Sequence, residues 1–166
     1  SISDELGAPV AGARILLGTE LTESDAEGNF RFARLRAGSY PLTISADGYQ
    51  QLQTEVSDLR AGEARILDAL TLSYATSTLR GVTTLEGRGE HAGIVISAAD
   101  LITGEVRSTL SAADGSWSLS PLRVGPYQVT SSALNYLSIT EEVELIEGVE
   151  RRLEQALSYD RGCLQG

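Results

Sequence analysis

Histidine and cysteine, the residues most often used as general bases, nucleophiles and metal ligands, occur once each in this chain, as His91 and Cys163. A Ser–His–Asp device needs its histidine beside a serine and an aspartate, whereas His91 lies in a loop flanked by Gly87, Gly89 and Gly93. A zinc site usually takes several histidine or cysteine ligands, and these two residues lie far apart in the sequence. We therefore expect no catalytic residue and no metal ligand, and we expect that the chain is not an enzyme.

A second candidate for chemistry is an acidic loop. Asp25, Glu27 and Asn29 place oxygen-bearing side chains around Gly28, and calcium prefers loops of this kind. Their spacing does not match an EF-hand loop, and the corresponding residues 114–116 keep only one aspartate and one serine. A tight turn explains the same residues, because glycine supplies a positive φ and short polar side chains bond the backbone. We therefore expect a turn here, and no cofactor.

The charge balance restricts the class of partner. All 13 basic residues are arginine, and 23 acidic residues bring the net charge to -10, which argues against nucleic acid or an anionic membrane as the main partner. No apolar run approaches the ~18 residues needed to cross a bilayer, and no signal segment opens the sequence. Either a targeting segment was removed or the sequence is a piece of a longer chain. Cys163 is expected to be a plain thiol, with a bridge to a following domain as the alternative.

The sequence contains an internal repeat, which indicates the elements that would carry these residues. When the sequence is aligned with itself at an offset of 87 residues, many identical residues coincide. Phe30 falls on Trp117, and the Leu-Ser-Tyr sequence at 72–74 recurs at 157–159. We therefore expect two homologous domains, residues 1–75 and 76–160, followed by a tail or linker at 161–166. The matched pairs include Gly28 with Gly115, Leu35 with Leu122, Arg36 with Arg123, Gly38 with Gly125, Tyr40 with Tyr127 and Tyr49 with Tyr136.

Both copies read as strands separated by turns. Apolar residues alternate with exposable ones, as at Tyr40, Leu42 and Ile44, and this period of two indicates β-structure. The short segments between turn signals predict an all-β fold of two tandem sandwiches with about seven strands each. The first copy is expected to lack its opening strand, since residues 1–4 look like the tail of a strand. Strands are expected at 13–18, 29–34, 38–46, 50–56 and 64–72, and at 77–85, 94–100, 105–111, 116–121, 126–133, 138–145 and 150–158.

Two further expectations concern single residues. Pro41 lies within an expected strand but cannot donate a ladder hydrogen bond, so the strand should be at a sheet edge there, or bulged. The aromatic residues recur at matched positions, which favours a core role over a sugar-stacking platform, because a binding surface would differ between copies. Trp117 and Phe30 are therefore expected to be buried at equivalent positions. The matched aromatic residues are Phe30, Tyr40 and Tyr49 in the first copy and Trp117, Tyr127 and Tyr136 in the second.

Residues 7–15 (GAPVAGARI), 24–32 (SDAEGNFRF), 35–42 (LRAGSYPL) and 48–49 (GY) follow a family pattern in order. In these residues the first copy resembles the carboxypeptidase regulatory-like domain, a transthyretin-like (prealbumin-like) Greek-key β-sandwich. The second copy departs from the pattern at Trp117, where the family has phenylalanine, and has no proline in its first loop. The resemblance implies a module that occurs in tandem in secreted and surface proteins of bacteria, where it serves as a spacer, stabiliser or binding accessory.

Related transthyretin-like folds include urate-pathway hydrolases and iron dioxygenases, which need several histidines, and collagen-adhesin B-type domains, which crosslink through lysine. One histidine and no lysine exclude all three devices here. We therefore expect a non-catalytic structural or interaction module, a spacer or stalk segment of a larger secreted or cell-surface protein, with bacteria as the expected source. Its expected partners are neighbouring domains of the same polypeptide or copies of itself in a surface assembly. The alternative is a carbohydrate- or peptide-binding accessory domain that acts through loops or a strand edge, for which no residues are singled out.

Overall fold

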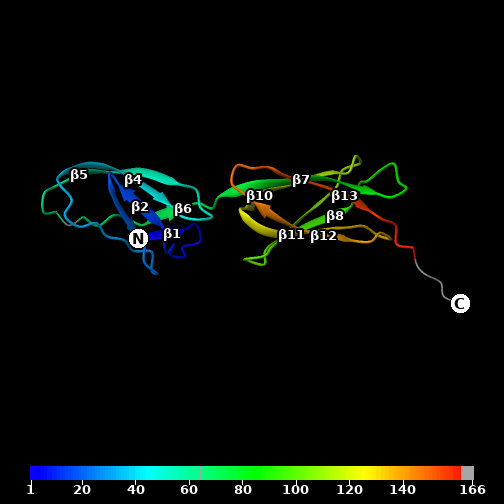
Figure 1. Cartoon of the computed structure of the whole chain (residues 1–166), viewed down its shortest axis with the longest axis horizontal. Coiled ribbons are helices and arrows are strands. Elements are labelled where there is room, and N and C mark those ends of the chain that lie inside the picture. The colour runs from blue at the N-terminus through cyan, green and yellow to red at the C-terminus, as the bar shows by residue number, and fades with distance from the viewer. Residues whose placement is uncertain (64, 162–166) are drawn as a thin grey trace. The chain divides into compact units, whose positions relative to one another are not determined.

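The computed structural model describes residues 1–63 and 65–161, and the chain divides into two compact units, Ser1–Ala75 and Thr76–Gly166. All regular secondary structure in the described ranges is β-strand, which confirms the all-β prediction (Figure 1). Within those ranges no helix is long and apolar enough to span a membrane.

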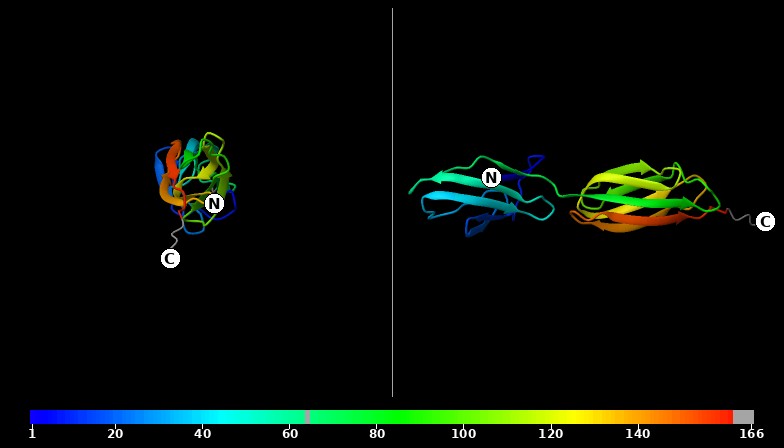
Figure 2. Two further views of the ribbon diagram at one scale, coloured as in Figure 1. Left: turned by 90° about the vertical axis from the view of Figure 1, so that its right-hand side faces the viewer. Right: turned by 90° about the horizontal axis from the view of Figure 1, so that it is seen from above.

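The second unit is a sandwich of two sheets. Its strands are β7 (Thr76–Leu85), β8 (Val95–Asp100), β9 (Val106–Leu110), β10 (Ser116–Arg123), β11 (Gly125–Ser132), β12 (Ile139–Leu145) and β13 (Arg151–Leu157). The three-stranded sheet has the order β10-β7-β13, and the four-stranded sheet has the order β12-β11-β8-β9. β7 is antiparallel to β10 and parallel to β13, and Figure 2 shows β7 and β13 running side by side in one direction. Alternate residues fill the core, as at Ile96 and Ala98 of β8, which are both fully buried.

The first unit has the same plan with a smaller second sheet. Its strands are β1 (Ile2–Asp4), β2 (Arg14–Leu17), β3 (Glu20–Glu23), β4 (Gly38–Ser45), β5 (Leu52–Leu59) and β6 (Leu70–Leu72). The order β3-β2-β4-β5 makes one antiparallel sheet, while β1 and β6 form a parallel pair. Ile2, Ile15, Ile44 and Leu72 are fully buried and contribute to a core between the two layers.

A repeated glycine contact aligns β1 with the end of β7. The Ile2 N–H donates to the Gly28 carbonyl oxygen at 2.7 Å, and the Thr83 N–H donates to the Gly115 carbonyl oxygen at 2.9 Å. Both glycines have positive φ, 75° and 82°. A Cβ at Gly28 would lie 2.2 Å from the Ile2 carbonyl oxygen, and one at Gly115 would lie 2.4 Å from that of Thr83. Only glycine allows both the positive φ and the close approach of the carbonyl oxygen. By this contact, Ile2 of the first unit corresponds to Thr83 of the second.

The strand predictions fail at three places in the first unit. Residues 29–34 form no strand, and of the expected strand 64–72 only β6 forms, whereas β3 was not expected at all. In the second unit the matching strand β10 is antiparallel to the first part of β7, from Ser116 opposite Val82 to Arg123 opposite Thr76. Since β1 corresponds only to the last part of β7, no residue of β1 lies opposite residues 30–36. A strand without a partner has no ladder, so this segment stays irregular.

The structure also explains Pro41. β4 is an interior strand, but β2 ends at Leu17, which is opposite Leu42, so β4 has already lost this neighbour at Pro41. The Pro41 carbonyl oxygen accepts from the turn residue Gly18 at 2.9 Å. In an antiparallel ladder the N and O atoms of one residue face the same side, so the proline nitrogen also faces this turn. No ladder bond is lost, as expected for a proline at a local edge.

Candidate functional site

His91 is bonded into the loop that follows β7. Its Nδ1 accepts from the Leu85 N–H at 3.0 Å, and its own N–H donates to the Ala113 carbonyl oxygen at 2.9 Å. Its carbonyl oxygen accepts from the Ser111 hydroxyl. A neutral imidazole with Nδ1 accepting has only Nε2 left to carry the proton. The ring therefore bonds the end of β7, while the backbone of His91 bonds Ala113 and Ser111, and none of these three partners is an acid.

The acidic loops are turns. Asp25 Oδ1 accepts from the N–H groups of Glu27, at 3.1 Å, and Asn29, at 2.7 Å. Asp114 Oδ1 accepts in the same way from Ser116, whose hydroxyl and N–H hold the pKa of the Asp114 carboxyl below its ordinary value. Among the described residues no group of three or more His, Cys, Asp or Glu side chains could hold a metal ion. The hydrogen bonds at Asp25 are those of a polar turn.

Asp100 closes a further turn, at the end of β8. Its Oδ1 accepts from the N–H of Ile102 at 2.8 Å and from that of Thr103 at 3.0 Å. Burial of the carboxyl raises the pKa of Asp100, but the hydrogen bonds from Thr103 and Ile102 outweigh burial, so the pKa lies below its ordinary value. The carboxylate is thus held ionised by the turn.

The matched aromatic residues belong to the cores, but not equally. Trp117 is 6% exposed, and its Nε1–H donates to the buried Thr83 hydroxyl at 2.9 Å. Phe30, expected to match it, is only half-buried and packs at the margin of its core. The expectation of equivalent burial is therefore wrong. The tyrosines pair within each unit: Tyr49 stacks on Tyr74 with ring centroids 5.1 Å apart, and Tyr136 meets Tyr159 at 5.5 Å.

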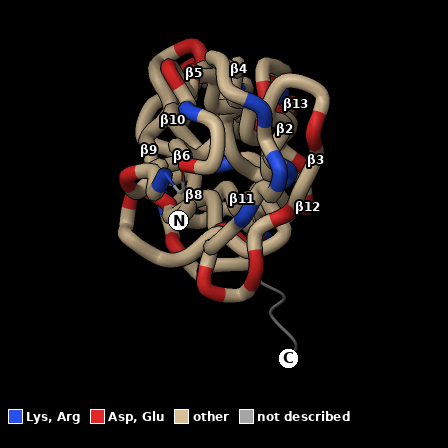
Figure 3. Tube along the Cα trace, turned by 90° about the vertical axis from the view of Figure 1, so that its left-hand side faces the viewer, with Lys and Arg blue, Asp and Glu red and all other residues tan. Residues whose placement is uncertain are grey.

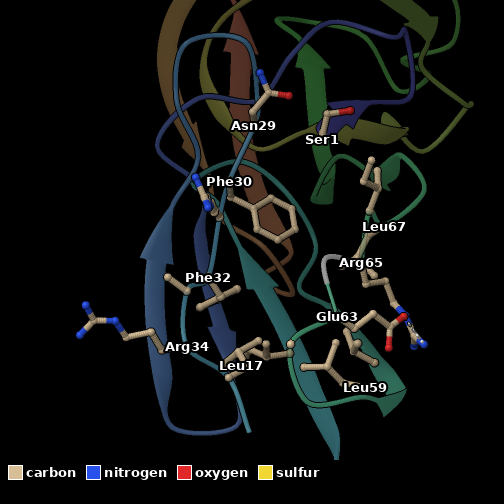
Figure 4. Close-up of a pocket in the computed structure, with 16 residues that line it drawn as sticks. Ser1, Leu17, Asn29, Phe30, Phe32, Arg34, Leu59, Glu63, Arg65 and Leu67 are labelled. Atoms are coloured by element: carbon tan, nitrogen blue, oxygen red, sulfur yellow. Dashed lines mark hydrogen bonds and ion pairs between the residues drawn. The ribbon is translucent and has the colours of Figure 1, made fainter. Parts of the chain in front are cut away.

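Beside Phe30 the first unit is open. A groove of about 690 Å³ separates residues 29–35 from residues 62–63 and 65–67. Figure 4 shows Phe30 and Phe32 on one side of it and Leu67 and Arg65 on the other. Leu17, Val56 and Leu59, each buried, also line the groove and give it an apolar floor.

Two charged residues of the groove, Glu63 and Arg65, bond each other and nearby backbone groups. Arg65 Nη2 lies 3.0 Å from Glu63 Oε1 and donates to the Asp58 carbonyl oxygen at 3.2 Å. The Arg60 N–H donates to Glu63 Oε2 at 2.9 Å. This bond above all, together with the Arg65 guanidinium, lowers the pKa of the Glu63 carboxyl below its ordinary value. No histidine lies among the described residues that line the groove.

Two segments beside the groove make no backbone–backbone hydrogen bonds. No backbone–backbone hydrogen bond joins residues 30–35 or residues 66–69 to any other described residue. In the second unit the corresponding place is filled, because β7 lies between β10 and β13. A Cβ at Gly81 of β7 would lie 2.4 Å from the Trp117 ring and 2.6 Å from the Leu153 carbonyl oxygen. The two units thus differ in this place: a strand occupies it in the second unit, and it is an open groove in the first.

The sequence did not predict the groove. The period-two pattern of Phe30 and Phe32 predicts a strand, and both side chains do face the core. The signal that could have found it was the start of β1, aligned on Gly28 and Gly115, which leaves residues 30–36 with no opposite strand. Arg161 is the last described residue, so the predictions for Cys163 and for the rest of the 161–166 tail lie outside the described residues.

Comparisons with known proteins agree with this architecture. The chain matches the model of the carboxypeptidase regulatory-like domain twice, over residues 1–73 and 74–158. No curated protein sequence matches it. Among solved structures it is similar to the Bacillus anthracis TIE protein, with a TM-score of 0.74 and 14% identity. That match covers 95% of this chain but only 33% of the TIE chain.

A second similar structure is a C-terminal fragment of the pilus adhesin SpaC from Lactobacillus rhamnosus GG. The TM-score is 0.53 at 12% identity, with 99% of this chain and 98% of that chain covered. At these identities the likeness establishes the fold. Because the family model matches both halves, the chain belongs to the carboxypeptidase regulatory-like domain family.

Proposed function

We propose that this chain is a non-catalytic structural module, a spacer or stalk segment of a larger secreted or cell-surface protein. The observation that carries the proposal concerns the polar side chains that could act in catalysis or bind a metal. Asp25 and Asp114 each accept from N–H groups of their own turns, and His91 accepts from the Leu85 N–H at the end of β7. Side chains used in this way shape turns, and a fold shared by a family does not by itself supply an activity.

The boundary between the units supports a spacer. The Ala75 N–H donates to the Gly48 carbonyl oxygen at 2.9 Å, and Ala75 is 2% exposed, so it belongs to the first unit. The next residue, Thr76, opens β7 and lies opposite Arg123 of β10. No residue separates the two units, so the connection that we propose for a spacer is a short one.

The surface location and the partners that we propose follow from the family. The family resemblance points to secreted and surface proteins, and the partners we propose are neighbouring domains or further copies of the chain. The net charge of -10 keeps such a module soluble. Figure 3 shows acidic and basic positions mixed along the trace rather than separated, which does not favour an anionic polymer as partner.

The spacer role is tested by the distance between two spin labels, one in each unit. Gln53→Cys and Glu142→Cys place the labels on exposed positions of β5 and β12, in a Cys163→Ser background. We expect one narrow distance distribution. The matched control inserts four residues, Gly-Ser-Gly-Ser, between residues 75 and 76 and should broaden it. A parent distribution as broad as that of the control would contradict the spacer role.

A second candidate function, peptide binding, is favoured by the groove. Extended peptides bind proteins by adding a strand to an exposed sheet edge, with main-chain hydrogen bonds giving affinity and alternate side-chain pockets giving specificity. Residues 30–35 and 66–69 offer unpaired main-chain groups on both sides of an apolar floor. A carbohydrate would instead call for an exposed aromatic platform, whereas Phe30 and Phe32 are half-buried.

A further inference from the structure

The second unit shows what fills the groove's position in this fold. There residues 79–82 of β7 lie between β10 and β13: Leu79 is opposite Leu119 and Arg151, and Val82 is opposite Ser116 and Glu154. In the first unit Ile2 stands at the place of Thr83, so Ser1 stands at the place of Val82. The register of a strand that continued β1 backwards from Ser1 is thereby determined, residue by residue.

The flanks of the groove are already arranged for such a strand. The Ser1 carbonyl oxygen accepts from the Leu70 N–H at 2.9 Å, so the ladder between β1 and β6 reaches the edge of the groove, which Ser1 lines. On the other side Phe30 and Phe32 both pack toward the core, with ring centroids 6.1 Å apart. Side chains two positions apart on one side are the arrangement of an extended backbone.

We propose that the groove of the first unit accepts one β-strand, joined to the amino end of Ser1, parallel to residues 66–69 and antiparallel to residues 30–35. This inference rests on the peptide-binding candidate above and names its ligand. The strand completes the sheet of β1 and β6 in the way that β7 completes the sheet of the second unit. A strand joined to Ser1 is favoured over a free one, because it enters the groove in register with no loop to close and at a high effective concentration.

The side chains of the accepted strand follow from those of β7. Ser77, Leu79 and Gly81 are the alternate residues that face inward there, while Thr78 and Arg80 face outward. Gly81 lies against the Trp117 ring, and Phe30 stands at the matching place in the first unit. An accepted strand should accordingly carry a small residue at the position of Gly81 and an aliphatic residue at the position of Leu79, to cover the apolar floor at Leu17.

The test adds six residues before Ser1, Thr-Ser-Thr-Leu-Arg-Gly, copied from positions 76–81. A matched control carries the same extension with aspartate in place of its leucine. Hydrogen exchange at residues 30–35 and 66–69 should slow at least about tenfold with the first extension and stay unchanged with the second. The melting temperature of the first unit should rise by more than about 5 °C, with the second unit as an unchanged internal reference.

Three outcomes would overturn the proposal. The first is an extension that leaves exchange at both segments unchanged, or that acts equally with leucine and with aspartate. The second is equal protection by the free peptide at about the same molar concentration as the protein, since a joined strand would then have no advantage. The third is protection that grows with the concentration of the unextended chain as dimers form, which would make a second copy the occupant. The spin-label distance does not involve the groove, so the spacer role can fail or hold separately.

Discussion

Replacing Trp117 by alanine removes a buried indole ring from the second unit and leaves a buried hydroxyl unpaired. Loss of a large buried ring costs about 3–5 kcal/mol of unfolding free energy. The ring's Nε1–H is the donor to Thr83, which is fully buried, and an orphaned buried polar group adds about 1–3 kcal/mol. The total approaches the whole stability of a small domain, about 5–15 kcal/mol, so we expect the second unit of Trp117→Ala to be largely unfolded near room temperature.

The same change at the matched position of the first unit should do much less. Phe30 is half-buried beside the open groove, so Phe30→Ala should cost about 1–2 kcal/mol. Trp117→Phe keeps most of the packing but removes the donor to Thr83, and it should cost about 1–3 kcal/mol. The three variants therefore separate burial of the ring from its hydrogen bond.

The assay must report each unit separately. Trp117 is the only tryptophan, so its fluorescence is lost in the variant, and calorimetry combined with hydrogen exchange of each unit replaces it. We expect the transition of the second unit to fall by more than about 15 °C while the first unit keeps its own. A Trp117→Ala protein whose second unit melts within about 2 °C of the parent would refute the reasoning, as would equal losses from Trp117→Ala and Phe30→Ala.

Three further predictions rest on the turns. Gly28→Ala and Gly115→Ala should each destabilise their own unit by more than about 2 kcal/mol in thermal unfolding, because the methyl group would overlap a carbonyl oxygen at positive φ. Gly48→Ala is the control, because its Cβ would meet nothing within 4 Å, and it should lower the unfolding free energy by only about 1 kcal/mol. Equal losses of unfolding free energy in all three variants would contradict the prediction. Treatment with a chelator should leave the melting temperature of the first unit unchanged, while Asp25→Ala should lower the stability of that unit by about 1 kcal/mol. A lower melting temperature in the presence of the chelator would reveal a bound ion and contradict the turn. Folding lowers the pKa of Asp100, so its contribution to stability is present above its unfolded pKa and is lost as the pH falls through the lower folded pKa. Asp100→Asn should therefore weaken the loss of stability of the second unit at acidic pH. A pH dependence equal to that of the parent would contradict this.

Some features of the site could be predicted because they depend on neighbours in sequence. The turn at Asp25 is one of them: its carboxylate reaches the N–H groups two and four residues ahead, and no distant residue is needed. The alternation of Leu42 and Ile44 likewise predicts β4, since both side chains lie on one face and are buried. β3 escaped prediction because residues 20–23 are mostly exposed on both faces, so this edge strand carries no period of two.

The sequence by itself determined the repeat, the all-β class, the family and the scarcity of residues for catalysis. Each of these depends on residue type and spacing. Whether Phe30 and Trp117 share one environment was decided only by the tertiary structure. Trp117 is buried because β7 supplies a strand beside β10, with Gly81 under the ring, while residues 30–35 have no such partner. A strand exists only when another segment completes its ladder, and that segment can lie anywhere in the chain, so no local pattern could have revealed the groove.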